Sequence, residues 1–421
     1  MSSDHPDAAV PVASPARPGW GGVFESLRIP KFRRYMLGYI GACVADSSFM
    51  VALGWLAFDL SDDASTLGAV LFTFGTCLSV SALVGGVVAD RYDRAVTIVS
   101  MQSIVTGVAV ALGVLVFTDH IELWHLFVAA ALAGTTISLQ YPAHIAFLYN
   151  LVGQKSLANA IAVNLGSNNA TRLFTPAIAG ILIGLWGVEA VYVMVVAGFV
   201  LSIVVVLTFV GSTTGGRSET TESPLTALTE GVRYLWGARP IFWIFVVLLL
   251  TSMFGFPYRD LLPAFAVDAL DKGPEQYGIM LSMIGLGSII GASMIAALTG
   301  ARRKGTIVVV MAVALGGLII ALSFAGTLIV ALVVLLIIGL ATSFVTAMGS
   351  IIMQTNVAAP FRGRVASFHL LTFGMHPAGA LLFGFLAEAT DIRVAYRVSG
   401  LVLIGLIAIV GLWRGDVRRL S

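Results

Sequence analysis

The sequence predicts an all-α integral membrane protein with twelve transmembrane helices in two pseudo-symmetric six-helix bundles. Of the 421 residues, 58% are hydrophobic and only 11% are charged, whereas a soluble protein carries about 25% charged residues. Apolar runs of 18 or more residues recur along the chain, and each is long enough to cross a hydrocarbon core of about 30 Å. Because a β-barrel would instead show segments of about ten alternating residues, we predict helical spans.

Charges, Gly/Pro clusters and polar gaps set the limits of the predicted spans. The spans cover 34–60, 66–89, 95–117, 123–148, 156–184, 188–210, 240–267, 275–299, 305–325, 327–354, 363–388 and 393–413. The longest interruption, residues 211–239, opens as a polar linker and continues as a short amphipathic stretch. We therefore expect a flexible tail over 1–30, a first bundle over 31–210, a cytoplasmic linker with a short amphipathic helix over 211–239, a second bundle over 240–414 and a tail over 415–421.

The distribution of basic residues predicts the orientation of the chain. If the N-terminus is cytoplasmic, 19 of the 24 Lys and Arg residues fall in cytoplasmic segments. Cytoplasmic loops carry the excess of basic residues in membrane proteins. We therefore expect both termini in the cytoplasm.

A charged turn after the second predicted span is the most specific motif. The stretch "GGVVADRYDRAV" places two acids and two arginines within five positions, Asp90 to Arg94. From composition alone, a solvated positive-inside loop explains it equally well. In its context, however, the turn resembles the signature loop of the major facilitator superfamily, a family of membrane transporters.

That resemblance implies a latch on the cytoplasmic side, in which Asp90 caps the eleventh span and Arg94 joins a charge cluster. A carboxylate at a helix N-terminus contributes about 0.3–1 kcal/mol. The residues implied are Gly86, Asp90, Arg91, Asp93, Arg94, Arg362 and Arg364. Because the equivalent loop of the second half, "GARRKG", has no acid, we expect one latch, acting on the outward-facing state.

Further stretches of the sequence indicate which bacterial branch of this superfamily the chain resembles. Segments such as "SLANAIAVN" and "RGRVASFHLLTFGMHPAGALLFGFLAE" look like the branch that holds enterobactin-type siderophore exporters and macrolide efflux proteins. The resemblance implies a monomeric exporter of the bacterial cytoplasmic membrane, with spans 1, 4, 7 and 10 around a central cavity.

Ionisable residues inside the spans are the best functional candidates, since each costs at least about 2.5–3.5 kcal/mol near the bilayer centre on insertion scales. Asp46 lies near the middle of span 1, and Arg172 lies at similar depth in span 5. We predict Asp46 as the proton-coupling residue, with Arg172 as its partner. The alternative is a purely structural ion pair between the two.

Span 7 contains a second candidate site, Arg259 and Asp260, which Pro257 and Pro263 bracket. Proline interrupts helical hydrogen bonding, and broken helices at membrane depth usually line a cavity. Arg259 is therefore a candidate for contact with an anionic or catecholate substrate. A local pair between Arg259 and Asp260 near the outer surface is an equally good interpretation.

Polar residues on neighbouring spans complete the predicted substrate site, although most such residues make helix-packing contacts. The candidates are Gln140, Asn168 and His376. Two small-xxx-small spacings, Gly180 with Gly184 on span 5 and Gly287 with Gly291 on span 8, suggest close approach where these spans meet across the halves.

These features favour a secondary transporter over an enzyme. No lysine stands in a Gly-Lys-Ser/Thr phosphate-binding loop and no metal-ligand motif is present, so we expect neither ATP hydrolysis nor a cofactor, a metal or nucleic-acid binding. The expected partners are a small-molecule substrate, protons and the lipid bilayer. We predict export of a small to medium, largely apolar or siderophore-like compound by proton antiport. The alternatives are lipid or lysolipid transport, and a non-transporting membrane sensor on the same fold.

Overall fold

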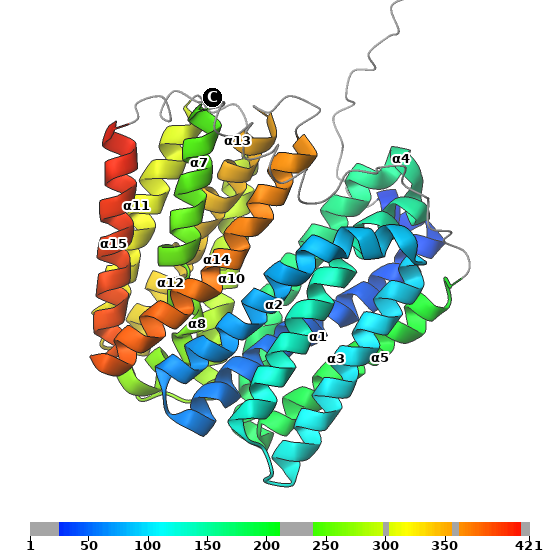
Figure 1. The fold of residues 1–421 in the computed structure, drawn as a ribbon, viewed down its shortest axis with the longest axis horizontal. Coiled ribbons are helices and arrows are strands. Elements are labelled where there is room, and N and C mark those ends of the chain that lie inside the picture. The colour runs from blue at the N-terminus through cyan, green and yellow to red at the C-terminus, as the bar shows by residue number, and fades with distance from the viewer. Residues whose placement is uncertain (1–24, 211–238, 298–302, 356–361, 414–421) are drawn as a thin grey trace, which may run out of the picture.

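A computed structural model describes residues 25–210, 239–297, 303–355 and 362–413. All regular elements within these ranges are helical (Figure 1). The first half comprises a short 3-10 helix, Glu25–Arg28, followed by α1 (Pro30–Ser61), α2 (Ala64–Arg91), α3 (Arg94–Phe117), α4 (Leu123–Trp186) and α5 (Val188–Leu207). The predicted all-α membrane class is therefore confirmed.

The long helix α4 combines two predicted spans, 123–148 and 156–184. It has a kink at Gly153, where φ is 68° and ψ is 174°. A residue with a Cβ atom adopts positive φ only at a steric cost, so glycine permits the chain to turn back there. The fourth and fifth spans are thus separate helical passes within one continuous element.

The second half begins with a broken span. It runs through α7 (Arg239–Leu250), the π-helix η2 (Thr251–Gly255), α8 (Pro257–Asp260), α9 (Leu262–Ala264) and the π-helix η3 (Phe265–Ala269). The helix breaks at Pro257 and Pro263, as the sequence predicts, because a proline lacks the backbone N–H of a helical hydrogen bond.

The remaining helices complete the second half. They are α10 (Pro274–Ala297), α11 (Lys304–Ser323), α12 (Leu328–Ser343), the π-helix η4 (Phe344–Met348), α13 (Gly349–Thr355), α14 (Arg362–Ala389) and α15 (Ile392–Trp413). Ten segments of the described residues are long and apolar enough to cross a membrane. The part of α4 after Gly153 and α14 are helical but not among the ten, so the count of twelve stays a prediction. Residues 1–24 and 414–421 and the linker over 211–238 lie outside the described residues, whereas residues 25–30 of the predicted tail form the 3-10 helix Glu25–Arg28 and the start of α1.

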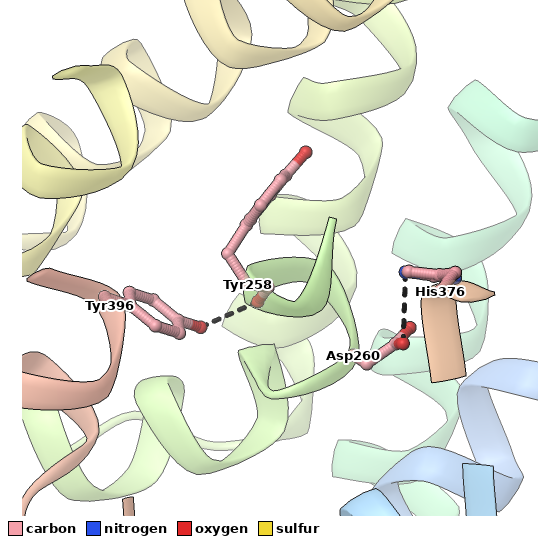
Figure 2. Close-up of polar contacts among 4 residues, drawn as sticks. All are labelled: Tyr258, Asp260, His376 and Tyr396. Carbon is pink, nitrogen blue, oxygen red and sulfur yellow. Dashed lines mark hydrogen bonds and ion pairs between the residues drawn. The ribbon is translucent and has the colours of Figure 1, made fainter. Parts of the chain in front are cut away.

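Side chains of α15 donate hydrogen bonds to backbone oxygens of the broken span, where the regular helical hydrogen bonds are interrupted. Tyr396 donates a hydrogen bond from its hydroxyl to the backbone oxygen of Tyr258, at 2.7 Å (Figure 2). Ser399 donates to the backbone oxygen of Phe254, at 2.5 Å. Backbone groups freed within the membrane must find such partners, because no water is available there. The break is therefore held in one conformation by the last helix.

Arg393 provides a third link from α15, and replacing it tests the importance of this support. Its guanidinium donates to the backbone oxygens of Ser323 (2.9 Å), Ala325 (3.0 Å) and Ala269 (2.6 Å). We expect Arg393→Gln to lower the free energy of unfolding by about 2–4 kcal/mol, since hydrogen bonds to charged groups are the stronger ones. Thermal unfolding of the detergent-solubilised protein measures this loss. The exposed Lys272→Gln is the control, and equal stability of the two variants would contradict the prediction.

The two ends of the molecule carry opposite charge. Lys31, Arg33, Arg34, Arg303 and Lys304 lie where α1 and α11 begin, and we call this the basic end. Asp62, Asp63, Asp268, Glu388 and Asp391 lie at the opposite end, which we call the acidic end. There, burial together with the charges of Asp62 and Asp391 raises the pKa of Asp268. Acids of the two halves therefore lie near one another at the acidic end.

Asp63 at the acidic end has a specific structural role and gives a pH-dependent prediction. Its carboxylate accepts hydrogen bonds from the backbone and hydroxyl groups of Ser65 and Thr66 at the start of α2, at 2.6–3.3 Å. Burial acts to raise its pKa, but the hydrogen bonds from Thr66 and Ser65 outweigh burial and hold the pKa below the usual 3.8. The stabilisation is therefore present above pH 3.8 and is lost as the pH falls through the lowered pKa.

We expect Asp63→Ala to lower the free energy of unfolding by about 1 kcal/mol at neutral pH, as for other lost helix caps. The difference from the unmodified protein should shrink as the pH falls below 3.8. Unfolding temperatures across this pH range provide the measurement, with Asp59→Ala on the last turn of α1 as the control. A difference that persists at the lowest pH would mean that the loss does not come from the ionised carboxylate.

Glycine-lined contacts join the halves toward the acidic end. On the α2–α14 side, Gly75 lies so close to the ring of Pro377 that an added Cβ atom would stand 1.9 Å from its Cγ, and Gly68 lies against the backbone of Ala380. On the α4–α10 side, Gly180 and Gly278 lie against each other's backbone. We call these two contacts the glycine seams. In Figure 1 the bundles converge at the acidic end, below, and diverge toward the basic end, above.

The prediction for the glycines of spans 5 and 8 is correct for one span only. Gly180 and Gly184 do contact α10, but Gly287 and Gly291 face Leu336 and Leu340 of α12, within the second half. Both Gly278 and Gly285 of α10 face α4, and Gly278 lies nine positions before Gly287. Nine residues at 3.6 per turn amount to two and a half turns, so the two glycines lie on opposite faces of the helix.

Candidate functional site

Asp46 lies on the central part of α1, partly buried, where α1 packs against α4. One turn earlier, Cys43 accepts a hydrogen bond on its sulfur from the side-chain nitrogen of Asn168, at 3.5 Å. Asn168, predicted as a substrate ligand, is therefore used in part to link α1 to α4. Asp46 makes no ion pair or side-chain hydrogen bond among the described residues.

Arg172 does not pair with Asp46 in this conformation. The arginine lies at the level where Gly285 of α10 packs against its backbone, and its side chain is exposed. Its electrostatic neighbours are Arg259 of the other half, together with Cys43, Tyr39 and Tyr141 of its own half. The partnership of Arg172 with Asp46 therefore stays a prediction, and the sequence does not predict Arg259 among the electrostatic neighbours of Arg172.

Asp260 pairs with His376 of α14, as Figure 2 shows. The imidazole Nε2 lies 3.1 Å from the carboxylate Oδ2, and both side chains are mostly buried, with exposures of 23% and 16%. The ring N–H is not aligned for a hydrogen bond, so the contact is electrostatic and is strongest when the histidine is protonated. The rings of Phe256 and His376 also pack edge to face, with 5.7 Å between their centroids.

This pairing bears on one interpretation of the Arg259–Asp260 dipeptide, the local ion pair. Among the described side chains, the ion-pair partner of Asp260 is His376 rather than Arg259, although Arg259 contributes to the electrostatic environment of the acid. The local Arg–Asp pair is therefore not formed. Arg259 is instead exposed, and its side chain makes no hydrogen bond among the described residues.

Gln140 contributes a buried acceptor rather than an open binding group. The residue is only 5% exposed, and its side-chain oxygen has no hydrogen-bond partner among the described atoms. An unsatisfied buried acceptor costs about 1–3 kcal/mol. The side-chain oxygen of this predicted substrate ligand is therefore buried without a hydrogen bond to offset the cost.

An aromatic contact that sequence reasoning missed joins the halves beside these residues. The rings of Trp55 on α1 and Tyr277 on α10 stack with 6.0 Å between centroids, and the Tyr277 hydroxyl lies next to Gly54. Tyr277 also interacts electrostatically with Arg259 and Asp260. The nearby "LGWLAFDL" and "YGIMLSM" stretches gave no sign of this pairing, because they lie more than 200 residues apart.

Of the residues in the predicted latch, the structure describes the side chains of Asp93 and Arg94. The side chains of Gly86, Asp90, Arg91, Arg362 and Arg364 lie outside the described residues. Asp93 accepts hydrogen bonds from the backbone of Ala95 and Val96 and so caps α3.

Arg94, the other described member of the predicted latch, binds within its own half. Its guanidinium donates to the backbone oxygen of Ala146 (3.0 Å) and to the side chain of Asn150 (2.8 Å), both on α4. These bonds hold the start of α3 against α4. The described contacts of Asp93 and Arg94 thus organise the first half, and the latch stays a prediction.

Within the described residues, the two halves of this helical membrane protein meet along glycine seams, and both halves carry ionisable residues inside their apolar helices. The sequence model of the transmembrane secretion effector family, a family of major facilitator superfamily transporters, matches residues 22–417. The chain therefore belongs to this family.

Individual relatives agree with this assignment. Enterobactin exporter EntS of Salmonella typhi is 26% identical, over 93% of this chain and 94% of its own. Macrolide efflux protein A of Streptococcus pyogenes is 22% identical, over 80% and 84%. Among solved structures, a bacterial homologue of the human lysosomal transporter Spinster matches with a TM-score of 0.72 at 14% identity, over 93% of this chain and 96% of that one. The last similarity concerns the fold alone.

Proposed function

We propose that the protein exports a small to medium, largely apolar or siderophore-like compound across the bacterial cytoplasmic membrane, by alternating access and in exchange for protons. The observation that carries the proposal is a set of ionisable residues inside the apolar helices of both halves. Asp46 and Arg172 belong to the first half, and Arg259, Asp260 and His376 belong to the second. Because such residues are costly within a membrane and usually mark transport pathways or proton relays, their presence in both halves supports transport.

The arrangement of the halves supports alternating access. Among the described residues, the glycine contacts between them lie toward the acidic end, and the bundles diverge toward the basic end (Figure 1). Since cytoplasmic loops carry the basic excess, the end at which the halves diverge would be the cytoplasmic one. Opening the glycine seams while the basic end closes would present the same residues to the outer side.

Two separate acids support proton exchange. Asp46 in the first half and the Asp260–His376 pair in the second are groups that gain or lose charge on protonation. A proton taken up at either place changes the electrostatic interaction between the halves, so that proton release and substrate movement are coupled through the same conformational change.

The efflux relatives direct the experiment that tests this function. Cells expressing the protein are loaded with a dye, a macrolide or a catecholate siderophore, and efflux is followed with and without a protonophore. We expect export above the level of cells lacking the protein, and we expect the protonophore to suppress it. In proteoliposomes, movement of a fluorescent lysolipid but of none of these compounds would favour the lipid alternative, and absence of any saturable flux would contradict transport.

A further inference from the structure

One face of α1 carries polar side chains from the basic end to the middle of the helix. These side chains stand at steps of four, four and three residues and belong to Tyr35, Tyr39, Cys43 and Asp46. Residues three and four apart share one face of a helix, so we call these four residues the polar face of α1. At a rise of 1.5 Å per residue the polar face extends for about 16 Å, which is roughly half the thickness of the hydrocarbon core.

The polar face of α1 begins with a hydrogen-bonded pair near the basic end. The hydroxyl oxygen of Tyr35, a fully buried residue, lies 2.9 Å from Nδ1 of His144 on α4. The ring of Tyr39 stacks on the ring of Tyr35, with 5.9 Å between centroids, and packs edge to face with the ring of His144, at 5.8 Å. Three side chains that can each accept and donate a proton therefore lie together.

A second contact fixes the polar face of α1 deeper in the membrane. There the side-chain nitrogen of Asn168 donates to the sulfur of Cys43, at 3.5 Å. His144 precedes the kink of α4 at Gly153 and Asn168 follows it, so the two passes of α4 contact α1 at successive depths. Isolated polar contacts of this kind serve helix packing. Here, however, they follow one another along α1 toward an ionisable acid, Asp46.

We propose that the polar face of α1, together with His144, is the route by which the proton of Asp46 reaches the basic end. This inference rests on the proposed proton-coupled export and assigns the path that the proton takes. Asp46, Tyr39 and His144 are only partly buried, so water can reach them and bridge the spaces between them. Tyr35 is buried, and its hydroxyl contacts His144 directly.

Each carrier keeps its own atoms during the transfer. The Asp46 carboxyl gives its proton to a neighbouring water molecule and becomes a carboxylate. The hydroxyl of Tyr39 and then that of Tyr35 accepts a proton on oxygen and releases the one it carried. His144 accepts the proton on Nδ1 and releases the one on Nε2 to water at the basic end, since one nitrogen of a neutral imidazole accepts while the other donates. Exchange with water restores the first tautomer, and the net change is one proton moved from Asp46 to the basic end.

Two transport measurements on proteoliposomes containing the full-length protein test this route. Transport driven by an imposed pH difference requires proton passage, whereas exchange of labelled for unlabelled compound at equal pH requires only movement of the loaded protein. The probes are rhodamine 6G, erythromycin and enterobactin. We expect Tyr35→Phe and His144→Gln each to lower the ratio of gradient-driven transport to exchange at least about tenfold, because a positioned proton carrier contributes about 10²–10⁴ in rate.

Matched variants separate the loss of a proton carrier from the loss of a side chain. Tyr192 on α5 is also buried, but its hydroxyl has no hydrogen-bond partner among the described residues, so Tyr192→Phe is the control for Tyr35→Phe. His120, which follows α3 and is exposed, provides His120→Gln as the control for His144→Gln. Both controls should keep the ratio of the unmodified protein. Adding Tyr35→Phe to Asp46→Asn should lower the ratio no further, since both changes interrupt one path.

The outcomes distinguish this inference from the proposed function. A ratio unchanged in both Tyr35→Phe and His144→Gln would overturn the route and leave the export function standing. An equal loss of exchange and of gradient-driven transport would do the same, because it would show that these side chains serve packing alone. Movement of none of the three probes by the unmodified protein, in either measurement, would contradict the export function and the route with it.

Discussion

Replacing Asp46 by asparagine should reduce gradient-driven export at least tenfold. Asparagine has nearly the same shape as aspartate but cannot bind and release a proton, so the central part of α1 loses its ionisable acid while the packing of the helix is retained. Efflux from loaded cells, compared with and without a protonophore, measures the loss. We expect the residual export of the variant to be insensitive to the protonophore.

The control for Asp46 is Asp59→Asn, which makes the same substitution on the same helix in an exposed position near the acidic end. It should leave export close to the unmodified level. If export by the Asp46→Asn variant remains normal and still responds to the protonophore, coupling does not depend on Asp46. The Asp260–His376 pair would then be the remaining candidate for the proton site.

Replacing Gly75 by valine should prevent the acidic end from closing as it does here. Even the Cβ atom alone would lie 1.9 Å from Cγ and 2.7 Å from Cβ of Pro377, and the proline ring is tied to the backbone of α14 and cannot rotate away. Overpacking of this kind costs about 1–3 kcal/mol, which changes the ratio of closed to open molecules by roughly 5- to 150-fold. We therefore expect loss of the closed acidic end and a large fall in export.

Distances between spin labels at the exposed positions 62 and 391 measure this opening, once Cys43 and Cys77, the two cysteines of the chain, have been replaced. Gly107→Val on α3 is the matched control, since a Cβ atom at Gly107 meets nothing within 4 Å. An unchanged distance distribution in the Gly75 variant would show that the α2–α14 seam gives way without separating the halves.

The sequence predicts the elements that depend on local composition, and it fails where contacts join distant segments. Apolar length predicts most of the spans, and Pro257 with Pro263 predicts the break in the seventh. The same local reasoning finds Asp46, Arg172 and Arg259, because a charge inside an apolar run is visible in isolation. It cannot find the pairing of Asp260 with His376, since these residues lie on helices whose relative rotation depends on packing across the whole second half.

The wrong prediction for Gly287 has the same origin. Small-xxx-small spacing shows that two glycines share a face of α10, but it does not show which neighbour that face meets. In the structure the neighbour is α12, while Gly278 on the other side of the helix meets α4. Both the site pairings and the seams thus depend on helix rotation, which hydropathy does not encode.

The α2–α14 seam also affects how the protein is assembled during synthesis. Gly75 and its partner Pro377 lie about 300 residues apart in the chain, which at typical translation rates of 5–20 residues per second corresponds to roughly 15–60 s. Throughout that interval the glycine-bearing face of α2 is already in the membrane without its partner helix, so lipid or the insertion machinery must cover it. The acidic end is therefore among the last parts of the molecule to be completed, and ribosome-bound chains ending before α14 should lack its protection from protease.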